Sequence, residues 1–229
     1  MRWNRQNKRT EIIWVLSLIF WEIFVMALFA ENKIIRLPTP NFSGSVSVEK
    51  AIAERRSIRQ FTDDPLSLEI VSQMMWAAQG ITDGDGKRTA PSAGATYPLE
   101  IYLVANRVEG LKSGIYHYLV DSHELEAIII QDLGKPLREA ARGQNMVEKA
   151  AFNIVIAADY QRTTARYGER GERYVHIEVG HVGQNIYLQA GALGLGTVAV
   201  GAFDDRKVQD LLKIKEKVLY IMPVGKPVH

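Results

Sequence analysis

Residues 114–130 read GIYHYLVDSHELEAIII, two runs rich in β-branched and aromatic residues on either side of the polar pair Asp121 and Ser122. Such runs predict two strands joined by a tight turn. A hairpin pairs its strands antiparallel, whereas a doubly wound sheet connects parallel strands through helices. The hairpin therefore indicates an α+β fold with a mixed or antiparallel sheet flanked by helices.

The segments on either side of this hairpin predict further strands and helices. Apolar runs predict strands at 100–105, 150–159, 196–201 and 217–223, and helical spacing predicts helices at 47–56, 67–80, 132–149, 174–193 and 204–213. Residues 82–98 form a long loop rich in Gly, Ser, Thr and Pro, and a loop of that length inside a domain is typical of a functional site.

Composition limits the classes of protein. The chain has 229 residues, of which 47% are hydrophobic, so it can bury a core and is not disordered. Its 28 basic and 26 acidic residues are spread without long basic runs, which argues against a dedicated nucleic-acid binder. The chain has no cysteine, which excludes disulfides, thiolate metal sites and a cysteine nucleophile.

The first thirty residues differ from the rest. Residues 12–30 are apolar apart from Ser17 and Glu22, and four basic residues precede them. This pattern predicts a signal peptide or a membrane anchor, with the following domain outside the cytoplasm. The alternative is an apolar helix buried in a subunit interface of a cytoplasmic protein, which Glu22 favours. We expect an extended linker at 31–46 and one domain at 47–229.

The first stretch with chemical potential is RRSIRQF, Arg55 to Phe61, directly after a short helix. Its guanidinium groups and the hydroxyl of Ser57 could surround an anion, since arginine binds phosphate in bidentate fashion. The alternative is a solvated set of bases that caps the helix dipole.

Two more stretches combine small residues with hydroxyls. PSAGATYP, at 91–98, leaves backbone amides open to a ligand that approaches closely, unless it is an ordinary connecting loop. GLGTVAVGAFDD, at 194–205, holds several glycines, but they do not stand between a strand and a helix as a dinucleotide-binding fingerprint requires. We therefore reject that fingerprint and expect Asp204 or Asp205 to cap the next helix.

Taken together, these stretches resemble the nitroreductase superfamily, and most closely its SagB-type (SagB/ThcOx) dehydrogenase branch. The similarity extends from Leu37 to the C-terminus. It includes ERRSIRQF at 54–61, DGDGKRTAPSAGATYPLEIYLV at 83–104, RYGERGERYVHIEVGHVGQNIYLQAGALGLGTVAVGAFDD at 166–205 and MPVGKP at 222–227.

The resemblance implies an α+β homodimer with one FMN at each end of the subunit interface. It implies that the phosphate is held by Arg55 and Ser57, and that Arg59 faces the N1–C2 edge of the flavin. The other cofactor-binding residues that it implies are Arg56, then Pro91, Ser92, Ala93 and Gly94 from the partner subunit, then Val200, Gly201 and Ala202 near N5, and Lys226 as the one basic residue near the C-terminus.

The sequence also departs from the family. Azoline-oxidising members of the branch use a Lys-Tyr pair, and here the nearest residues are Arg166 and Tyr167. Arginine cannot act as a general base near neutral pH, so Tyr167 is the single candidate catalytic residue, and the sequence leaves open whether the protein oxidises azolines. We expect no metal, because His176 and His181 are five residues apart and too few ligands accompany them.

These observations predict an FMN-dependent oxidoreductase that transfers hydride through flavin N5 by a ping-pong mechanism. NAD(P)H is the expected small-molecule donor, and the acceptor is a second small molecule. The alternatives are a membrane-tethered flavin- or ligand-binding module without turnover, and a structural dimer whose N-terminal helices swap.

Overall fold

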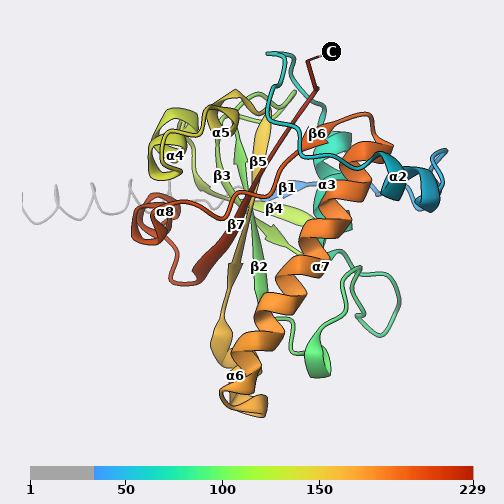
Figure 1. The fold of residues 1–229 in the computed structure, drawn as a ribbon, viewed down its shortest axis with the longest axis vertical. Helices are drawn as coiled ribbons and strands as arrows, with labels where there is room; N and C mark the ends of the chain where they lie inside the picture. The colour runs from blue at the N-terminus through green and yellow to red at the C-terminus, as the bar shows by residue number, and fades with distance from the viewer. Residues whose placement is uncertain (1–33, 229) are drawn as a thin grey trace, which may run out of the picture. The chain divides into compact units, whose positions relative to one another are not determined.

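A seven-stranded sheet forms the centre of the molecule in the computed structural model, which describes residues 34–228 (Figure 1). The strands lie in the order β1-β4-β3-β2-β5-β7-β6, and each neighbouring pair is antiparallel. Their bounds are β1 (Ile34–Arg36), β2 (Leu99–Ala105), β3 (Gly114–Leu119), β4 (Glu124–Ile129), β5 (Phe152–Ala158), β6 (Gly196–Thr197) and β7 (Lys217–Gly225). The hairpin prediction is confirmed, since β3 and β4 pair across the expected turn.

Helices cover both faces of the sheet. Their bounds are α2 (Val48–Glu54), α3 (Leu68–Gln79), α4 (Gly134–Ala140), α5 (Asn145–Lys149), α6 (Tyr160–Tyr167), α7 (Arg170–Ala192) and α8 (Asp205–Leu212). Successive residues of a strand point to opposite faces. In β2, Ile101 and Leu103 pack in one core with α3 and α7, while Tyr102 and Val104 pack in the other with α4 and α8. The class is therefore α+β, as the hairpin indicated.

Three helical or strand predictions need correction. The single helix expected at 132–149 is two helices, because Arg142 and Gly143 have φ of 57° and 76° and end the first one. The long helix begins at Arg170 rather than 174, and the unpredicted α6 precedes it. The strand expected at 196–201 contains only two residues, after which Val200 forms an isolated bridge with Ile221.

Residues 31–46 were expected to be only a linker. Within them, residues 34–36 form β1 and pair with β4, and Asn41 exchanges hydrogen bonds with the side chain of Gln73 on α3. The predicted signal or anchor at residues 1–30 lies outside the described residues. From residue 34 to residue 228, the structure has no helix that is both long and apolar enough to span a bilayer.

Candidate functional site

The arginine segment, residues 55–61, is fixed by close packing against two glycines. A Cβ built on Gly196 would lie 2.6 Å from Ile58 Cγ2, and one on Gly225 would lie 2.9 Å from the ring of Phe61. Distances that short are not compatible with a side chain. Ile58 also donates its amide hydrogen to the carbonyl of Thr197 at 2.9 Å. The two apolar residues of this segment, Ile58 and Phe61, therefore hold it, and Arg59 and Gln60 between them are exposed.

Tyr187 of α7 connects the arginine segment to the stretch after β6. Its phenol oxygen lies 2.9 Å from Ser57 Oγ and accepts the amide hydrogen of Ala199 at 2.8 Å. The guanidinium of Arg55 lies over the ring of Tyr187, 5.1 Å from its centroid. Two of the three predicted stretches thus meet at one tyrosine.

The other basic candidates are placed differently. Arg56 donates to the carbonyls of Ala53 and Arg55, so it closes the end of α2 as a helix cap would. Arg59 is exposed. Lys226 forms an exposed ion pair with Asp64 at 3.5 Å, so its charge is partly compensated within the chain.

A cavity of about 350 Å³ lies beside this segment, between α2, the C-terminal end of α7 and β6. Arg55, Arg56, Tyr187, Thr197 and the acidic Glu54 are among the residues that line it. Neither Arg55 nor Arg59 has a carboxylate within 4.0 Å among residues 34–228. The buried Thr197 Oγ1 has no hydrogen-bond partner there. The cavity is thus lined by both a cation without a carboxylate partner and a residue with an unpartnered hydroxyl, and a phosphate group satisfies both needs, so these residues fit a phosphate-bearing cofactor.

The serine turn, residues 91–97, has an unusual backbone. Gly94, Ala95 and Tyr97 have φ of 60°, 52° and 43°, values that residues with a side chain rarely adopt. Ser92 Oγ accepts the amide hydrogen of Tyr97 at 2.9 Å and stabilises the turn. The turn therefore presents Ser92, Ala93 and Gly94 in one fixed shape.

Gly94 is in contact with the predicted Arg166-Tyr167 pair. A Cβ on Gly94 would lie 2.5 Å from the phenol oxygen of Tyr167, and Arg166 donates to the carbonyl of Gly94 at 3.2 Å. The guanidinium of Arg166 lies over the ring of Tyr167, 5.4 Å from its centroid. The structure thus brings the only candidate catalytic residue against the second stretch.

Glu178 lies beneath the serine turn and is 2% exposed. Burial raises the pKa of this carboxyl, while hydrogen bonds from Ser92 and Gln79 act in the opposite direction. Gln79 Nε2 donates to Glu178 Oε1 at 3.4 Å.

Val200, Gly201 and Ala202 follow β6. Val200 is buried and exchanges backbone hydrogen bonds of 2.9 and 3.0 Å with Ile221. Gly201 and Ala202 are exposed, and the carbonyl of Ala202 accepts from Gln144 at 2.8 Å. The last two residues are therefore accessible to a ligand.

The predicted residues form two groups rather than one. Ser57 meets α7 at Tyr187 and Ser92 meets it at Glu178. Nine residues of helix separate these positions by roughly 14 Å along the axis and place them on opposite sides. Figure 1 shows α7 running between α6 at one end and β6 and α2 at the other.

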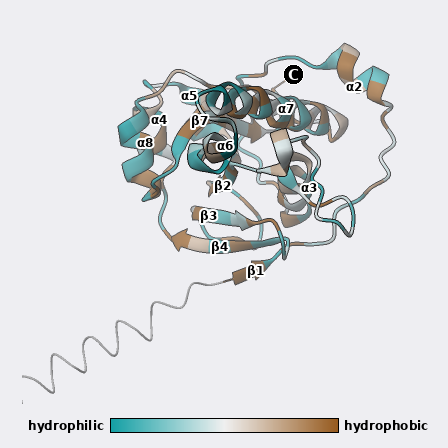
Figure 2. Cartoon of the chain, turned by 90° about the horizontal axis from the view of Figure 1, so that it is seen from below, coloured by the Kyte–Doolittle hydropathy of each residue, from teal (hydrophilic) through white to brown (hydrophobic). Residues whose placement is uncertain are grey.

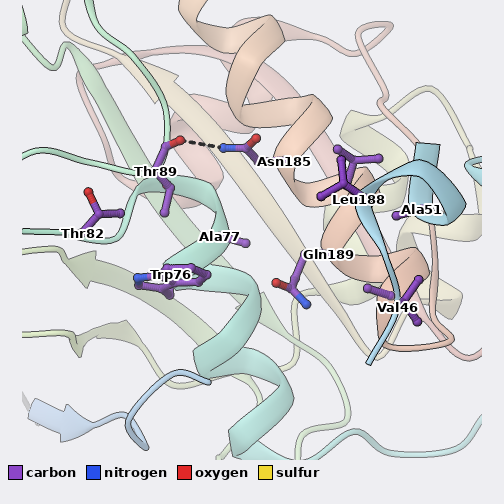
Figure 3. Close-up of a pocket in the computed structure, with 11 residues that line it drawn as sticks. Val46, Ala51, Trp76, Ala77, Thr82, Thr89, Asn185, Leu188 and Gln189 are labelled. Atoms are coloured by element: carbon purple, nitrogen blue, oxygen red, sulfur yellow. Dashed lines mark hydrogen bonds between the residues drawn. The ribbon is translucent and has the colours of Figure 1, made fainter. Parts of the chain in front are cut away.

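A second cavity, of about 400 Å³, lies between α2, α3 and α7 (Figure 3). Val46, Ala51, Trp76, Leu188 and Gln189 are among the residues that line it. Its lining is mainly apolar, and Thr82 and Thr89 are its contribution from the long loop at 82–98. It carries no charged group to bind a phosphate.

The comparisons with known proteins agree with this geometry. The sequence pattern described as "Nitroreductase family" matches residues 52–226, which is most of the chain. The chain belongs to the nitroreductase family.

Three relatives refine this family assignment. The chain is 48% identical to MJ1384 of Methanocaldococcus jannaschii, which carries the name nitroreductase, over 80% of this chain and 93% of that protein. It is 26% identical to the microcin B17-processing protein McbC of Escherichia coli, over 82% and 73% of the two chains. It is 25% identical to the FMN reductase [NAD(P)H] of Bacillus subtilis, over 78% and 63%. The similarity to McbC supports the SagB-type branch of the nitroreductase family.

Solved structures of the nitroreductase family have the same fold. A crystal structure of a protein from Ralstonia eutropha, described as a nitroreductase, superposes with a TM-score of 0.76 at 25% identity and covers 87% of this chain and 92% of that one. The antiparallel sheet flanked by helices is thus the nitroreductase fold.

Sequence reasoning missed Tyr187, Thr197 and the role of Glu178. The sequence pattern around Tyr187 predicts a helix face that packs in the core. Thr197 lies in a predicted strand, where threonine is common. A carboxylate within a mainly apolar stretch of helix was the one available signal for a buried polar contact.

Proposed function

We propose that this protein is an FMN-dependent oxidoreductase that transfers hydride through flavin N5 by a ping-pong mechanism. The observation that carries the proposal is the cavity beside the arginine segment, where Arg55 and the unpartnered Thr197 Oγ1 lie together. Membership of the nitroreductase family and the similarity to an FMN reductase support the choice of flavin.

The predicted site residues would bind the phosphate, set the charge around the flavin ring and handle a proton. Arg55 and Ser57 hold the phosphate, with Arg56 and Lys226 adding positive charge nearby. Arg59 places a cation at the N1–C2 edge, which favours negative charge on the ring. Gly201 and Ala202 lie near N5, and Tyr167 holds or moves a proton at its phenol oxygen. FMN, when bound, supplies the centre that accepts and donates hydride.

The proposed active unit is a homodimer. The serine turn and the arginine segment contact α7 on opposite sides and roughly 14 Å apart along its axis, so we propose that Pro91, Ser92, Ala93 and Gly94 reach the flavin of the partner subunit. An exposed stripe on α7 that includes Ile177, Gly180, His181 and Gln184 offers a surface for that contact. A two-fold axis across it would bring the end of one α7 near the beginning of the other.

We also propose, from the sequence alone, that residues 12–30 tether the domain to a membrane and that the domain lies outside the cytoplasm. This proposal is tested by fractionating cells that produce either the full chain or a chain that lacks residues 1–30. Retention of the shortened protein in the membrane fraction would contradict it.

The proposed function is tested by the visible absorption spectrum of the purified protein, before and after anaerobic NADPH or NADH. We expect flavin bands that bleach on reduction. Stoichiometric flavin that no nicotinamide or quinol reduces would favour the alternative of a binding module without turnover. A colourless protein that does not take up added FMN would contradict both.

A further inference from the structure

Helix α6 lies along the serine turn and is bonded to it at successive levels. Residues one helical turn apart each donate to a backbone carbonyl of the turn or of the residue after it: the amide of Asp159 to Pro98 at 2.9 Å, the side chain of Arg162 to Tyr97 at 3.1 Å and that of Arg166 to Gly94 at 3.2 Å. Positions three or four residues apart lie on one face of a helix. One face of α6 therefore holds the turn along its length.

Arg162 also connects the turn to the sheet. Its Nη2 donates to Glu100 Oε1, on strand β2. The other oxygen of that carboxylate lies 2.7 Å from His117 Nε2, on the neighbouring strand β3. Because β2 is paired with a strand on each side and the Glu100 side chain is only 15% exposed, this carboxylate has a fixed position. One guanidinium group thus joins a fixed acceptor in the sheet to a backbone carbonyl of the turn.

Tyr97 is the residue of the turn whose backbone needs this support. It carries a side chain at a φ of 43°, a conformation that persists only where surrounding contacts determine it. Its amide donates to Ser92 Oγ within the turn, and its carbonyl accepts from Arg162 outside the turn. A hydrogen bond from a charged donor is stronger than one between neutral groups. Loss of the Arg162 side chain would therefore loosen the end of the turn that leads into β2.

We propose that Arg162 is a positioning residue that ties the Tyr97 carbonyl to Glu100 and so fixes the serine turn where β2 begins. Its two Nη atoms donate in fixed directions, which the compact ammonium group of lysine cannot reproduce. The consequence for the flavin rests on the proposed function, in which the turn contacts the FMN of the partner subunit, but the consequence for the turn does not. Arg162 touches neither the cofactor nor a substrate in this proposal.

Amide hydrogen exchange at Tyr97, in the full-length protein without FMN, tests the effect on the turn. Arg162→Ala should speed exchange of this amide by about fivefold, because a charge-assisted hydrogen bond at a partly exposed position is lost. Arg162→Lys should exchange almost as fast, because it keeps the charge but not the double contact. The amide of Ile154 on β5, a strand paired on both sides, reports on global stability.

Arg107→Ala is the matched control. Arg107 also donates to backbone carbonyls, those of Asp63 and Lys149 at 3.0 and 2.7 Å, and its side chain is 30% exposed. It follows the opposite end of β2 and makes no contact with the serine turn among residues 34–228. This variant should leave exchange at Tyr97 unchanged relative to exchange at Ile154.

Three results would overturn the proposal. The first is unaltered exchange at Tyr97 in Arg162→Ala. The second is equal acceleration at Tyr97 and Ile154, which would mean a general loss of stability. The third is full protection of Tyr97 in Arg162→Lys, because a positive charge alone would then suffice. If Arg162→Ala does not fold, the lysine variant still decides between these results.

FMN affinity provides a second readout. Arg162→Ala should raise the Kd for FMN by about threefold, and Arg107→Ala should leave it unchanged. If the wild-type protein does not bind FMN, the proposed function fails, and the exchange data still decide the role of Arg162 in the turn. If the wild type and Arg162→Ala bind FMN equally, the consequence for the flavin is overturned and the proposed function stands.

Discussion

The arginine segment and the serine turn contact the same helix but are held in different ways. Ile58 and Phe61 anchor the arginine segment by apolar contact with Gly196 and Gly225. The serine turn is instead held by hydrogen bonds, in which Ser92 Oγ accepts from the amide of Tyr97 and the carbonyl of Gly94 accepts from Arg166. Apolar anchoring leaves Arg55 and Arg59 without carboxylate partners among residues 34–228, whereas Arg88 and Arg166, which lie beside the turn, are hydrogen-bonded within the chain.

This difference teaches where each region can bind. A segment whose positive charges remain uncompensated can attract an anion. A turn that contains no charged residue, and whose neighbouring arginines are hydrogen-bonded within the chain, can only present its backbone and small side chains. The first is suited to a phosphate and the second to the face of a planar ring.

The largest effect on stability is expected from a substitution that disrupts the apolar contact between Gly196 and Ile58. Gly196→Val should lower the free energy of unfolding by about 3 kcal/mol, because its side chain would overlap Ile58 in a closely packed site. Urea denaturation measures this. Gly84→Ala is the control, since a Cβ there meets nothing within 4 Å. A loss below about 1 kcal/mol at Gly196 would show that Ile58 can move aside.

The next largest effect is on FMN affinity, and it should differ between the neighbouring residues Arg55 and Arg56. Arg55→Ala should raise the Kd for FMN by about 30-fold through loss of a charged hydrogen bond to the phosphate. Arg56→Ala should raise it by only about threefold, because Arg56 is bonded to the carbonyls at the end of α2. Titration of protein with FMN, followed by fluorescence quenching, gives both values. Equal losses would assign both guanidinium groups to the phosphate.

The stability of the protein should depend on pH through Glu178, which lies beneath the serine turn. Burial raises the pKa of Glu178 above its usual 4.5, so the folded state binds this proton more tightly than the unfolded state. The resulting stability is fully present below about pH 4.5 and is lost as the pH rises through the folded-state pKa. Glu178→Gln removes this dependence.

Relative to the wild type, the Glu178→Gln variant should therefore gain stability as the pH rises from 4.5 through the folded-state pKa of Glu178. Denaturation at a series of pH values measures the difference. Parallel stability curves for the two proteins would contradict the assignment, and Arg55→Ala should give such parallel curves.

The smallest effect concerns the hydrogen bond between Ser57 and Tyr187. A double-mutant cycle with Ser57→Ala and Tyr187→Phe should give a coupling free energy of about 0.5–1 kcal/mol for unfolding. A value near zero would mean that the arginine segment depends on Ile58 and Phe61 alone.

The sequence predicted the outlines of both regions, but not how they are held. The hairpin, the strand order within it and the three stretches follow from residue types and local spacing. Tyr187 and Glu178 could not be assigned, because their roles depend on residues more than eighty positions away in the chain. Helix ends were misplaced where left-handed residues such as Arg142, rather than glycine or proline alone, set the boundary.

The cavity between α2, α3 and α7 has a spectroscopic consequence. The chain contains four tryptophans, at positions 3, 14, 21 and 76, and only Trp76 belongs to residues 34–228. Trp76 lines that cavity and donates its indole hydrogen to the carbonyl of Ile81 at 3.3 Å (Figure 3). α3, which carries Trp76, and α7 pack against each other, and Figure 2 shows the two helices near one another in the hydropathy-coloured view. A protein shortened to residues 34–229 would therefore carry one tryptophan, whose emission, excited selectively at wavelengths that tyrosine does not absorb, reports on the packing of these helices without any added label.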